Sequence, residues 1–140
     1  MALVCDTGPR LAALDLDDPD HVACANLLSA ATDDLIVPGL VLAELDYWCR
    51  KLGIEAAWLV FVEDIERGAW HIEWPSAADL RRARQLQETY ADLGLGVVDA
   101  SIVALVERLG ETKVATLDRR HFSVVRPAHV AALLLLPAPT

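Results

Sequence analysis

The stretch Ala2-Leu3-Val4-Cys5-Asp6-Thr7-Gly8-Pro9 decides the fold of this chain. Its apolar run, closed by an acid, predicts a short buried strand over 2–6. Thr7-Gly8-Pro9 then predicts a turn into a short helix, because proline fits the first position of a helix. A buried strand followed at once by a helix is the repeating unit of an α/β protein. We therefore expect strands and helices to alternate along the rest of the chain.

The alternation continues to the end of the sequence. Further strands are predicted at 35–37, 69–74 and 113–117, with a last short strand or helix within 130–136. The helices between them are predicted at 18–31, 40–52, 54–67, 76–91 and 98–109. Ser76 and Asp79 resemble a capping box at the start of one helix. Apolar strands separated by helices indicate a mainly parallel sheet covered on both faces, an α/β/α sandwich.

The bulk composition narrows the class of protein. The chain has 140 residues with no repeat or composition break, so we expect one domain over 1–140. A hydrophobic content of 54% exceeds what one core needs and predicts a partner or a second copy. The apolar runs are too short to span a bilayer, and no basic leader precedes the first strand. Cys5, Cys24 and Cys49 lie in apolar settings, which predicts reduced, buried thiols and a cytoplasmic location.

The net charge of −9 argues against a general nucleic-acid coat protein, because phosphate contacts need a basic face. It does not exclude a nuclease, since acids that bind a metal ion make a site that is locally neutral or positive when loaded. Contacts to nucleic acid would then be local. Arg119 and Arg120 are the best placed basic residues, although a solvated loop explains them equally well.

Four acids stand where a folded α/β protein does not easily accommodate them. In a parallel sheet the ligand site lies beyond the carboxyl ends of the strands, and Asp6 and Asp118 follow two such ends. Asp99 opens a helix and precedes its apolar stripe. Glu44 interrupts another helix stripe, made of Val41, Leu45, Trp48 and Leu52. We expect the four acids to converge at one edge of the sheet.

Each acid also has a structural explanation that involves no ligand. Asp6 can cap the helix that follows it, Asp99 can be an ordinary N-cap, and Asp118 can be a turn residue. Glu44 is harder to explain in this way because it lies inside a helix among apolar neighbours. Asp92 is intermediate, either a fifth acid near the site or a solvated residue.

Several carboxylates in one place repel one another and raise one another's pKa. A hard divalent cation reverses the effect, and Mg²⁺ or Mn²⁺ prefers carboxylate oxygens. Such an ion activates a water nucleophile and stabilises charge on a phosphate. Zinc is not expected because no Cys or His cluster has zinc spacing. The scattered histidines give no hydrolase triad, and the Gly94-x-Gly96 pair follows a helix, so it is no dinucleotide loop.

Four blocks of sequence together resemble a known family: Asp6-Thr7-Gly8, Val41-Leu42-Ala43-Glu44, Gly96-Val97-Val98-Asp99-Ala100-Ser101 and Ala115-Thr116-Leu117-Asp118-Arg119-Arg120-His121-Phe122. Their order resembles that of PIN-domain ribonucleases, most closely the VapC toxins of bacterial type II toxin–antitoxin pairs, from residue 2 to about 127. The resemblance implies a PIN-like α/β/α sandwich and a Mg²⁺- or Mn²⁺-dependent endoribonuclease. It also implies a homodimer that a VapB-type antitoxin inhibits. Many members have serine where this chain has Gly8.

Carried over by position, Asp6 and Asp99 are metal ligands, and Glu44 and Asp118 complete the catalytic acidic set. An alternative is a catalytically inactive PIN-like module that binds RNA or protein without cutting. The presence of all four acids favours the enzyme. A phospho-receiver of doubly wound fold is a weaker alternative, because such receivers need paired acids at the first strand, and this chain has only Asp6 there.

Overall fold

The computed structural model describes residues 1–139 and contains a five-stranded sheet in the order β3-β2-β1-β4-β5. All four strand pairs are parallel. The strands are β1 (Ala2–Cys5), β2 (Asp34–Pro38), β3 (His71–Glu73), β4 (Lys113–Ala115) and β5 (Leu134–Leu136). The helices are α1 (Thr7–Leu14), α2 (His21–Ala30), α3 (Gly39–Lys51), α4 (Glu55–Glu66), α5 (Ala77–Thr89), α6 (Val97–Leu109) and α7 (Arg119–Val124), with a 3₁₀ turn η1 (Ala91–Leu93).

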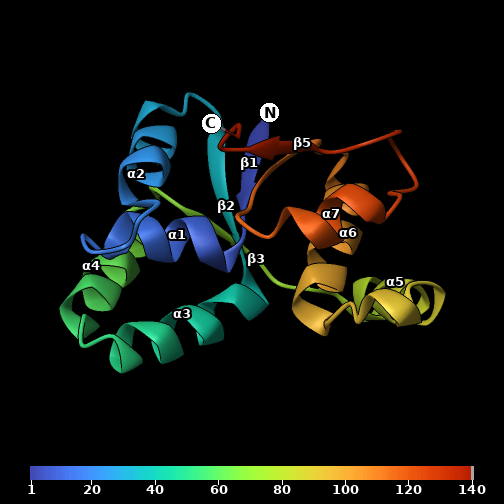
Figure 1. Ribbon diagram of the computed structural model, residues 1–140, viewed down its shortest axis with the longest axis horizontal. Coiled ribbons are helices and arrows are strands. Elements are labelled where there is room, and N and C mark those ends of the chain that lie inside the picture. The colour runs from blue at the N-terminus through green and yellow to red at the C-terminus, as the bar shows by residue number, and fades with distance from the viewer. Residues whose placement is uncertain (140) are drawn as a thin grey trace.

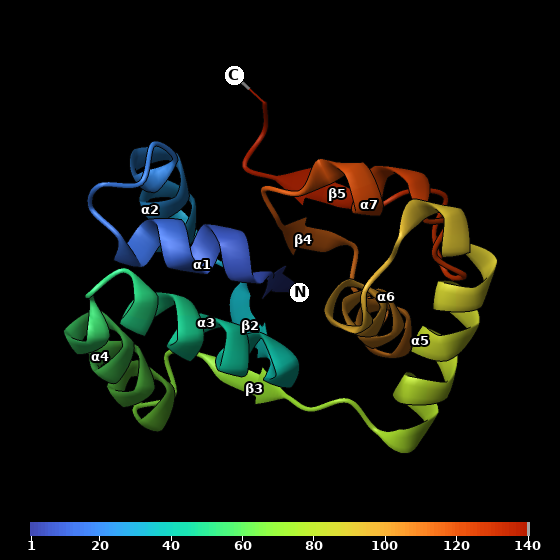
Figure 2. The same cartoon turned by 60° about the horizontal axis from the view of Figure 1, so that its bottom comes forward.

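The helices form two groups with the sheet between them. Helices α1 to α4 lie on one side, and α5, α6 and α7 lie on the other (Figures 1 and 2). The expected α/β/α sandwich is confirmed, and the sheet is entirely parallel in the part of the chain that is described. Strand β1 is central, with Val4 paired to Ile36 of β2 and to Val114 of β4. All of β1 is buried, which explains its unbroken apolar sequence.

Helix α6 is more deeply buried than its sequence stripe predicts. We expected one apolar face, but every residue from Ala100 to Val106 is buried. The reason is that α6 packs both toward the sheet and against α5, the helix pair with the most extensive contact. A helix covered on two sides is apolar nearly all round. Asp99 lies just before this buried segment, in the first turn of α6.

Helix α3 differs from expectation in the opposite sense. Its buried face is made by Val41, Leu45 and Cys49, whereas Trp48 and Leu52 are 41% and 48% exposed. The predicted stripe of Val41, Leu45, Trp48 and Leu52 is therefore wrong at its last two members, which lie off the buried face. Cys49 takes the place on the core face because it follows Leu45 by one helical turn.

The remaining differences are at short or terminal elements. Helix α2 begins at His21 rather than at residue 18, and β4 ends at Ala115, before the predicted end at 117. Helix α7 was not predicted, because its six residues are too few to show a helical period. The segment within 130–136 contains strand β5. The Ser76–Asp79 capping box is confirmed by both of its hydrogen bonds.

The three cysteines are buried and unpaired, as expected. Across residues 1–139, none of the helices has the length and apolar character needed to cross a membrane.

Candidate active site

Asp6 lies at the carboxyl end of the central strand and is held there by three hydrogen bonds. Its amide donates to the carbonyl of Ala115 at 2.9 Å, which continues the β1–β4 ladder. Its Oδ1 accepts from the Thr7 amide at 2.8 Å, and its Oδ2 accepts from the Thr116 hydroxyl at 3.0 Å. Asp6 is thus the N-cap of α1, as the structural explanation held. The cap fixes the carboxyl group without removing it from the sheet edge.

The pKa of Asp6 is raised from 3.8 to about 6. Burial is the largest cause, since Asp6 is only 7% exposed, and the charge of Asp99 is the second. The hydrogen bonds from Thr7 and Thr116 act in the opposite direction, and the charge of Glu44 raises the pKa further. Asp6 therefore lies within electrostatic reach of two other acids that the sequence placed at this edge.

Glu44 reaches the same junction from α3. Its Oε1 accepts a hydrogen bond from the hydroxyl of Thr7. The backbone amide of the same Thr7 donates to Asp6 Oδ1. Gly39 begins α3 under the ring of Trp74, where a Cβ atom would lie only 2.1 Å from Trp74 Cε3. This close approach packs the start of α3 against Trp74, the residue that follows β3. Glu44 then projects from the second turn toward β1.

Asp99 and Asp118 are joined by a histidine that sequence reasoning missed. His121 Nδ1 lies 2.6 Å from Asp99 Oδ2 and 3.6 Å from Asp118 Oδ2. One ligand atom from each of the three residues falls within 4.8 Å of the others. His121 is itself buried, while Asp118 is exposed. The sequence does contain a local signal for this contact, because residues three apart on a helical turn lie on the same side, and His121 follows Asp118 by three. It was missed because α7 was not predicted.

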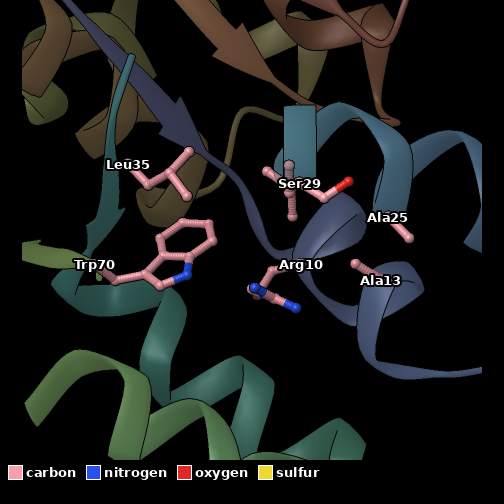
Figure 3. A pocket seen from close by; sticks show the side chains of 7 residues that line it. Arg10, Ala13, Ala25, Ser29, Leu35 and Trp70 are labelled. Carbon is pink, nitrogen blue, oxygen red and sulfur yellow. The ribbon is translucent and has the colours of Figure 1, made fainter. Parts of the chain in front are cut away.

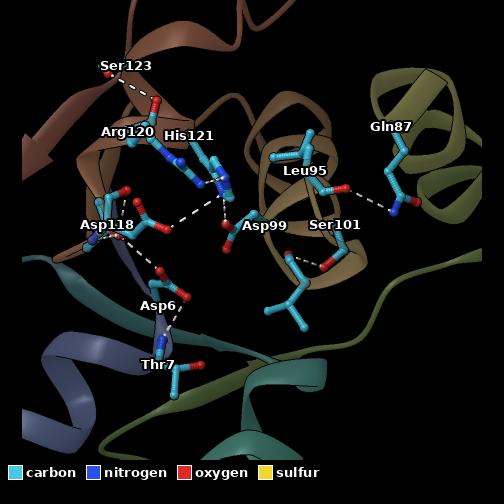
Figure 4. A network of polar contacts seen from close by, with 12 residues as sticks. Asp6, Thr7, Gln87, Leu95, Asp99, Ser101, Asp118, Arg120, His121 and Ser123 are labelled. Atoms are coloured by element: carbon cyan, nitrogen blue, oxygen red, sulfur yellow. Dashed lines mark hydrogen bonds and ion pairs between the residues drawn. The ribbon is translucent and has the colours of Figure 1, made fainter. Parts of the chain in front are cut away.

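Thr116 is the second residue that sequence reasoning missed. Its hydroxyl donates to Asp6 Oδ2 and accepts from the Asp118 amide at 3.1 Å. It is 1% exposed, so it links the ends of β1 and β4 inside the protein. Figure 4 shows the side chains of Asp6, Asp99, Asp118 and His121 gathered at this edge.

Few positive charges lie near these four acids to balance their negative charge. In residues 1–139, none of Asp6, Glu44, Asp99 and Asp118 forms an ion pair with lysine or arginine. Asp99 is also not the N-cap of α6, since Gly96 holds that position. Neighbouring carboxylates that no lysine or arginine neutralises form the donor set that Mg²⁺ or Mn²⁺ prefers. The residues present therefore fit a hard divalent cation.

Other candidates lie outside this cluster or have another task. Asp92 is exposed in η1 and does not join the Asp99–Asp118–His121 group. Arg119 donates to the carbonyls of Leu135 and Pro137 at 2.9 and 2.7 Å, so it holds the C-terminal segment. Arg120 is exposed, with Nη2 3.1 Å from His121 Nε2, which leaves it as the basic residue beside the site.

The structure explains why a glycine occupies position 8. A Cβ atom at this position would lie 3.3 Å from the Cβ of Leu117, which is a tight contact. The glycine lets the first turn of α1 approach the loop that carries Asp118.

Comparison with known proteins agrees with this geometry. A family model, the PIN domain, matches residues 3–126. The chain therefore belongs to the PIN-domain family. Within that family its relatives include Ribonuclease VapC26 of Mycobacterium tuberculosis, which is 34% identical over 136 residues, covering 96% of this chain and 100% of that protein. The chain thus belongs with the VapC proteins.

Solved structures share the fold at low sequence identity. VapC20 of Mycobacterium tuberculosis, described as a toxin that cleaves the sarcin–ricin loop, has a TM-score of 0.72 at 17% identity, over 80% of this chain and 86% of that one. VapBC2 of Rickettsia felis, bound to a DNA fragment from its promoter, has a TM-score of 0.67 at 20% identity, over 96% and 97% of the two chains. FitAcB of Neisseria gonorrhoeae has a TM-score of 0.58 at 20% identity, over 95% of both chains.

Proposed function

We propose that this protein is a divalent-metal-dependent endoribonuclease, the toxin of a type II toxin–antitoxin pair, built as one PIN domain over residues 1–140. The observation that carries the proposal is twofold: Asp99 and Asp118 gather with His121, and Asp6 lies within electrostatic reach of Asp99 and Glu44. In residues 1–139, none of these four acids forms an ion pair with lysine or arginine. Membership of the PIN-domain family and the relation to a protein named Ribonuclease VapC26 support it.

In this proposal Asp6 and Asp99 are the principal metal ligands, and Glu44 and Asp118 complete the catalytic set. These residues would hold Mg²⁺, with Mn²⁺ as an alternative, and the ion would supply an activated water nucleophile and offset charge on the phosphate. Thr116 and the Thr7 amide hold the two oxygens of Asp6 in place. His121 holds one oxygen of Asp99, which limits the directions in which that carboxylate can turn.

The substrate in this proposal is RNA, bound over the carboxyl edge of the sheet. Arg120 is exposed beside His121 and provides a local contact for a phosphate, although the chain as a whole is acidic. An inactive binding module is the alternative. The presence of all four acids favours the enzyme, because binding alone requires no such set. The carboxylates of Asp6, Glu44 and Asp99 also have fixed hydrogen-bond partners.

A VapB-type antitoxin is the proposed partner, and the protein itself is proposed to be a homodimer. The resemblance to VapBC2 and FitAcB structures supports this fold-level analogy. Exposed apolar side chains on α3 and α4 support an interface there, with Tyr47, Leu59 and Val60 each more than half exposed. A cytoplasmic location belongs to the same proposal, because a toxin of this kind must reach RNA inside the cell.

The test compares Asp99→Asn with Asp92→Asn, an exposed acid outside the cluster. Mn²⁺ binding is followed by electron paramagnetic resonance, and cleavage is followed on single-stranded RNA with Mg²⁺ or Mn²⁺. Asp99→Asn should weaken metal binding and reduce the cleavage rate by on the order of 10² or more, whereas Asp92→Asn should change neither. Full activity in Asp99→Asn would overturn the site assignment. Metal binding by the wild type without any RNA cleavage would favour the inactive module.

A further inference from the structure

Arg10 lies on α1, four residues after Asp6, but it takes no part in the acidic cluster. Its guanidinium carbon sits 4.9 Å from the centre of the Phe61 ring and 5.1 Å from that of Trp70. The two rings meet edge to face, with 87° between their planes. Arg10 therefore lies in an aromatic corner, where cation–π attraction stabilises the face of the guanidinium.

The aromatic rings leave the edge of the guanidinium without partners. Within residues 1–139 its nitrogens form no hydrogen bond or ion pair, and its Nε is fully buried. Burial lowers the pKa of Arg10, and the charge of Asp64 only partly opposes this. Asp64 itself is paired with Arg67. Arg10 as a residue is half-buried, but its Nε–H is buried and unused, which is unfavourable because an unmade hydrogen bond of a charged group costs free energy.

The same guanidinium lines a cavity of about 240 Å³ between α1, α2 and the edge of the sheet. Figure 3 shows Arg10 at the centre of its lining, with Trp70 and Leu35 on one side and Ala13, Ala25 and Ser29 on the other. Apart from Arg10, the wall is mostly apolar. The cavity thus combines one positive charge with room for a small apolar body.

We propose that this cavity binds a carboxylate carried on a short apolar body, with the carboxylate on the edge of Arg10. Arginine presents N–H donors in a planar fork that matches the two oxygens of a carboxylate. The single charge of Arg10 balances one negative charge. A phosphate monoester carries nearly two at neutral pH and would find no second cation here. The carboxylate comes either from a free small molecule or from an acidic side chain of a partner protein.

The test uses sodium butyrate as the probe, with neutral butanamide and sodium chloride at matched ionic strength as comparisons. Side-chain Nε–H resonances of arginine are followed by ¹H–¹⁵N spectroscopy, and the Arg10 resonance is assigned from its loss in Arg10→Lys. Butyrate should shift this resonance saturably, with a dissociation constant on the order of 1 mM, as expected for so small a ligand. Butanamide and chloride should leave it unchanged. Equal shifts with chloride would overturn the proposal.

A melting experiment gives a second readout with a matched control. Butyrate should raise the melting temperature of the wild type and of Arg81→Gln, an exposed arginine on α5, but not that of Arg10→Gln. If Arg10→Gln does not fold, the resonance titration of the wild type decides the matter. Tighter binding of inorganic phosphate than of butyrate at the Arg10 resonance would contradict a monocarboxylate site.

A peptide comparison separates the two sources of the carboxylate. An acetylated, amidated peptide with one glutamate among leucines and alanines is compared with its glutamine counterpart. Tenfold tighter binding of the glutamate peptide than of butyrate assigns the cavity to a partner's side chain. Butyrate binding as tightly as the peptide assigns it to a free small molecule. Failure of both to shift Arg10 would overturn the proposal.

Discussion

The surroundings of Asp6 shift its pKa in opposite directions. As the cap of α1 and the acceptor of the Thr116 hydroxyl it is stabilised in its charged form. Its burial and the nearby charge of Asp99 outweigh these bonds and raise its pKa to about 6. The empty site is therefore under electrostatic strain at neutral pH, and a bound cation would relieve that strain.

The first prediction concerns the stability of the metal-free protein. The folded pKa of Asp6 lies about two units above its ordinary value of 3.8, so its protonated form favours folding. That contribution is complete below pH 4 and is lost as the pH rises through 6. Asp6→Asn should remove this loss and stabilise the metal-free protein at pH 7 by on the order of 2–3 kcal/mol.

Urea unfolding in EDTA from pH 4 to pH 8 measures this difference. Asp17→Asn, at an exposed loop position, should run parallel to the wild type and controls for net charge. A wild type and an Asp6→Asn variant with the same pH dependence would show that Asp6 titrates normally in the folded protein.

His121 is the subject of the second prediction. Because Nδ1 holds Asp99 Oδ2 at 2.6 Å, His121→Ala should free that carboxylate and weaken Mn²⁺ binding by about 10- to 100-fold. His121→Asn retains a donor near the Nδ1 position and should recover part of the affinity. Calorimetric titration with Mn²⁺ measures both. His71→Asn, on an exposed histidine of β3, is the control, and equal affinities for all variants would leave His121 with a packing role only.

At the scale of elements, the helix α7 gives its two adjacent arginines, Arg119 and Arg120, different environments. Sequence reasoning treated Arg119 and Arg120 together as RNA contacts. The short helix turns them apart: Arg119 reaches two carbonyls of the C-terminal segment, and Arg120 stays exposed at the site. Replacing both at once would therefore mix a loss of stability with a loss of RNA contacts.

The third prediction separates the two arginines. Arg119→Ala should lower the free energy of unfolding by about 1–3 kcal/mol, because it leaves two carbonyls at β5 and after it without their donor. Arg120→Ala should change stability by less than about 0.5 kcal/mol. In an Asp99→Asn background, Arg120→Ala should weaken RNA binding and reduce the salt slope by about 1. An unchanged slope would assign Arg120 to the solvated surface.

At the scale of the whole molecule, α3 contributes Glu44 to the acidic edge and, together with α4, carries an apolar surface. Phe61 of α4 is fully buried in the core, but Tyr47, Trp48, Leu59 and Val60 remain substantially exposed. A monomer rarely exposes so many large apolar side chains on adjacent helices. The surface also carries a groove lined by Leu42, Trp58, Val62 and Ile65, which makes the helix pair suited to association.

The fourth prediction tests that association. Leu59→Ser combined with Val60→Ser should leave the fold intact, because both side chains are more than half exposed. It should weaken self-association or antitoxin binding by about tenfold or more, since each buried side chain contributes on the order of 1 kcal/mol. Val22→Ser, on exposed α2, is the control. Analytical ultracentrifugation from micromolar to submillimolar concentration reports the change. A wild type that stays monomeric and retains no partner would contradict it.

Local sequence was enough to predict the strands, most helices and the parallel sheet, because buried strands and caps are encoded by neighbouring residues. It was also enough to single out Asp6, Glu44, Asp99 and Asp118 as candidate site residues, since acids at strand ends and inside apolar stripes stand out without knowledge of the fold. Only the tertiary structure revealed the partners of these acids. The Thr116 hydroxyl meets Asp6 across 110 residues of sequence, and His121 meets Asp99 across 22. The same is true of Arg10, whose aromatic corner joins α1, α4 and the residue before β3. A buried polar group must satisfy its hydrogen bonds with whatever the fold places beside it, and that choice is made in space rather than along the chain.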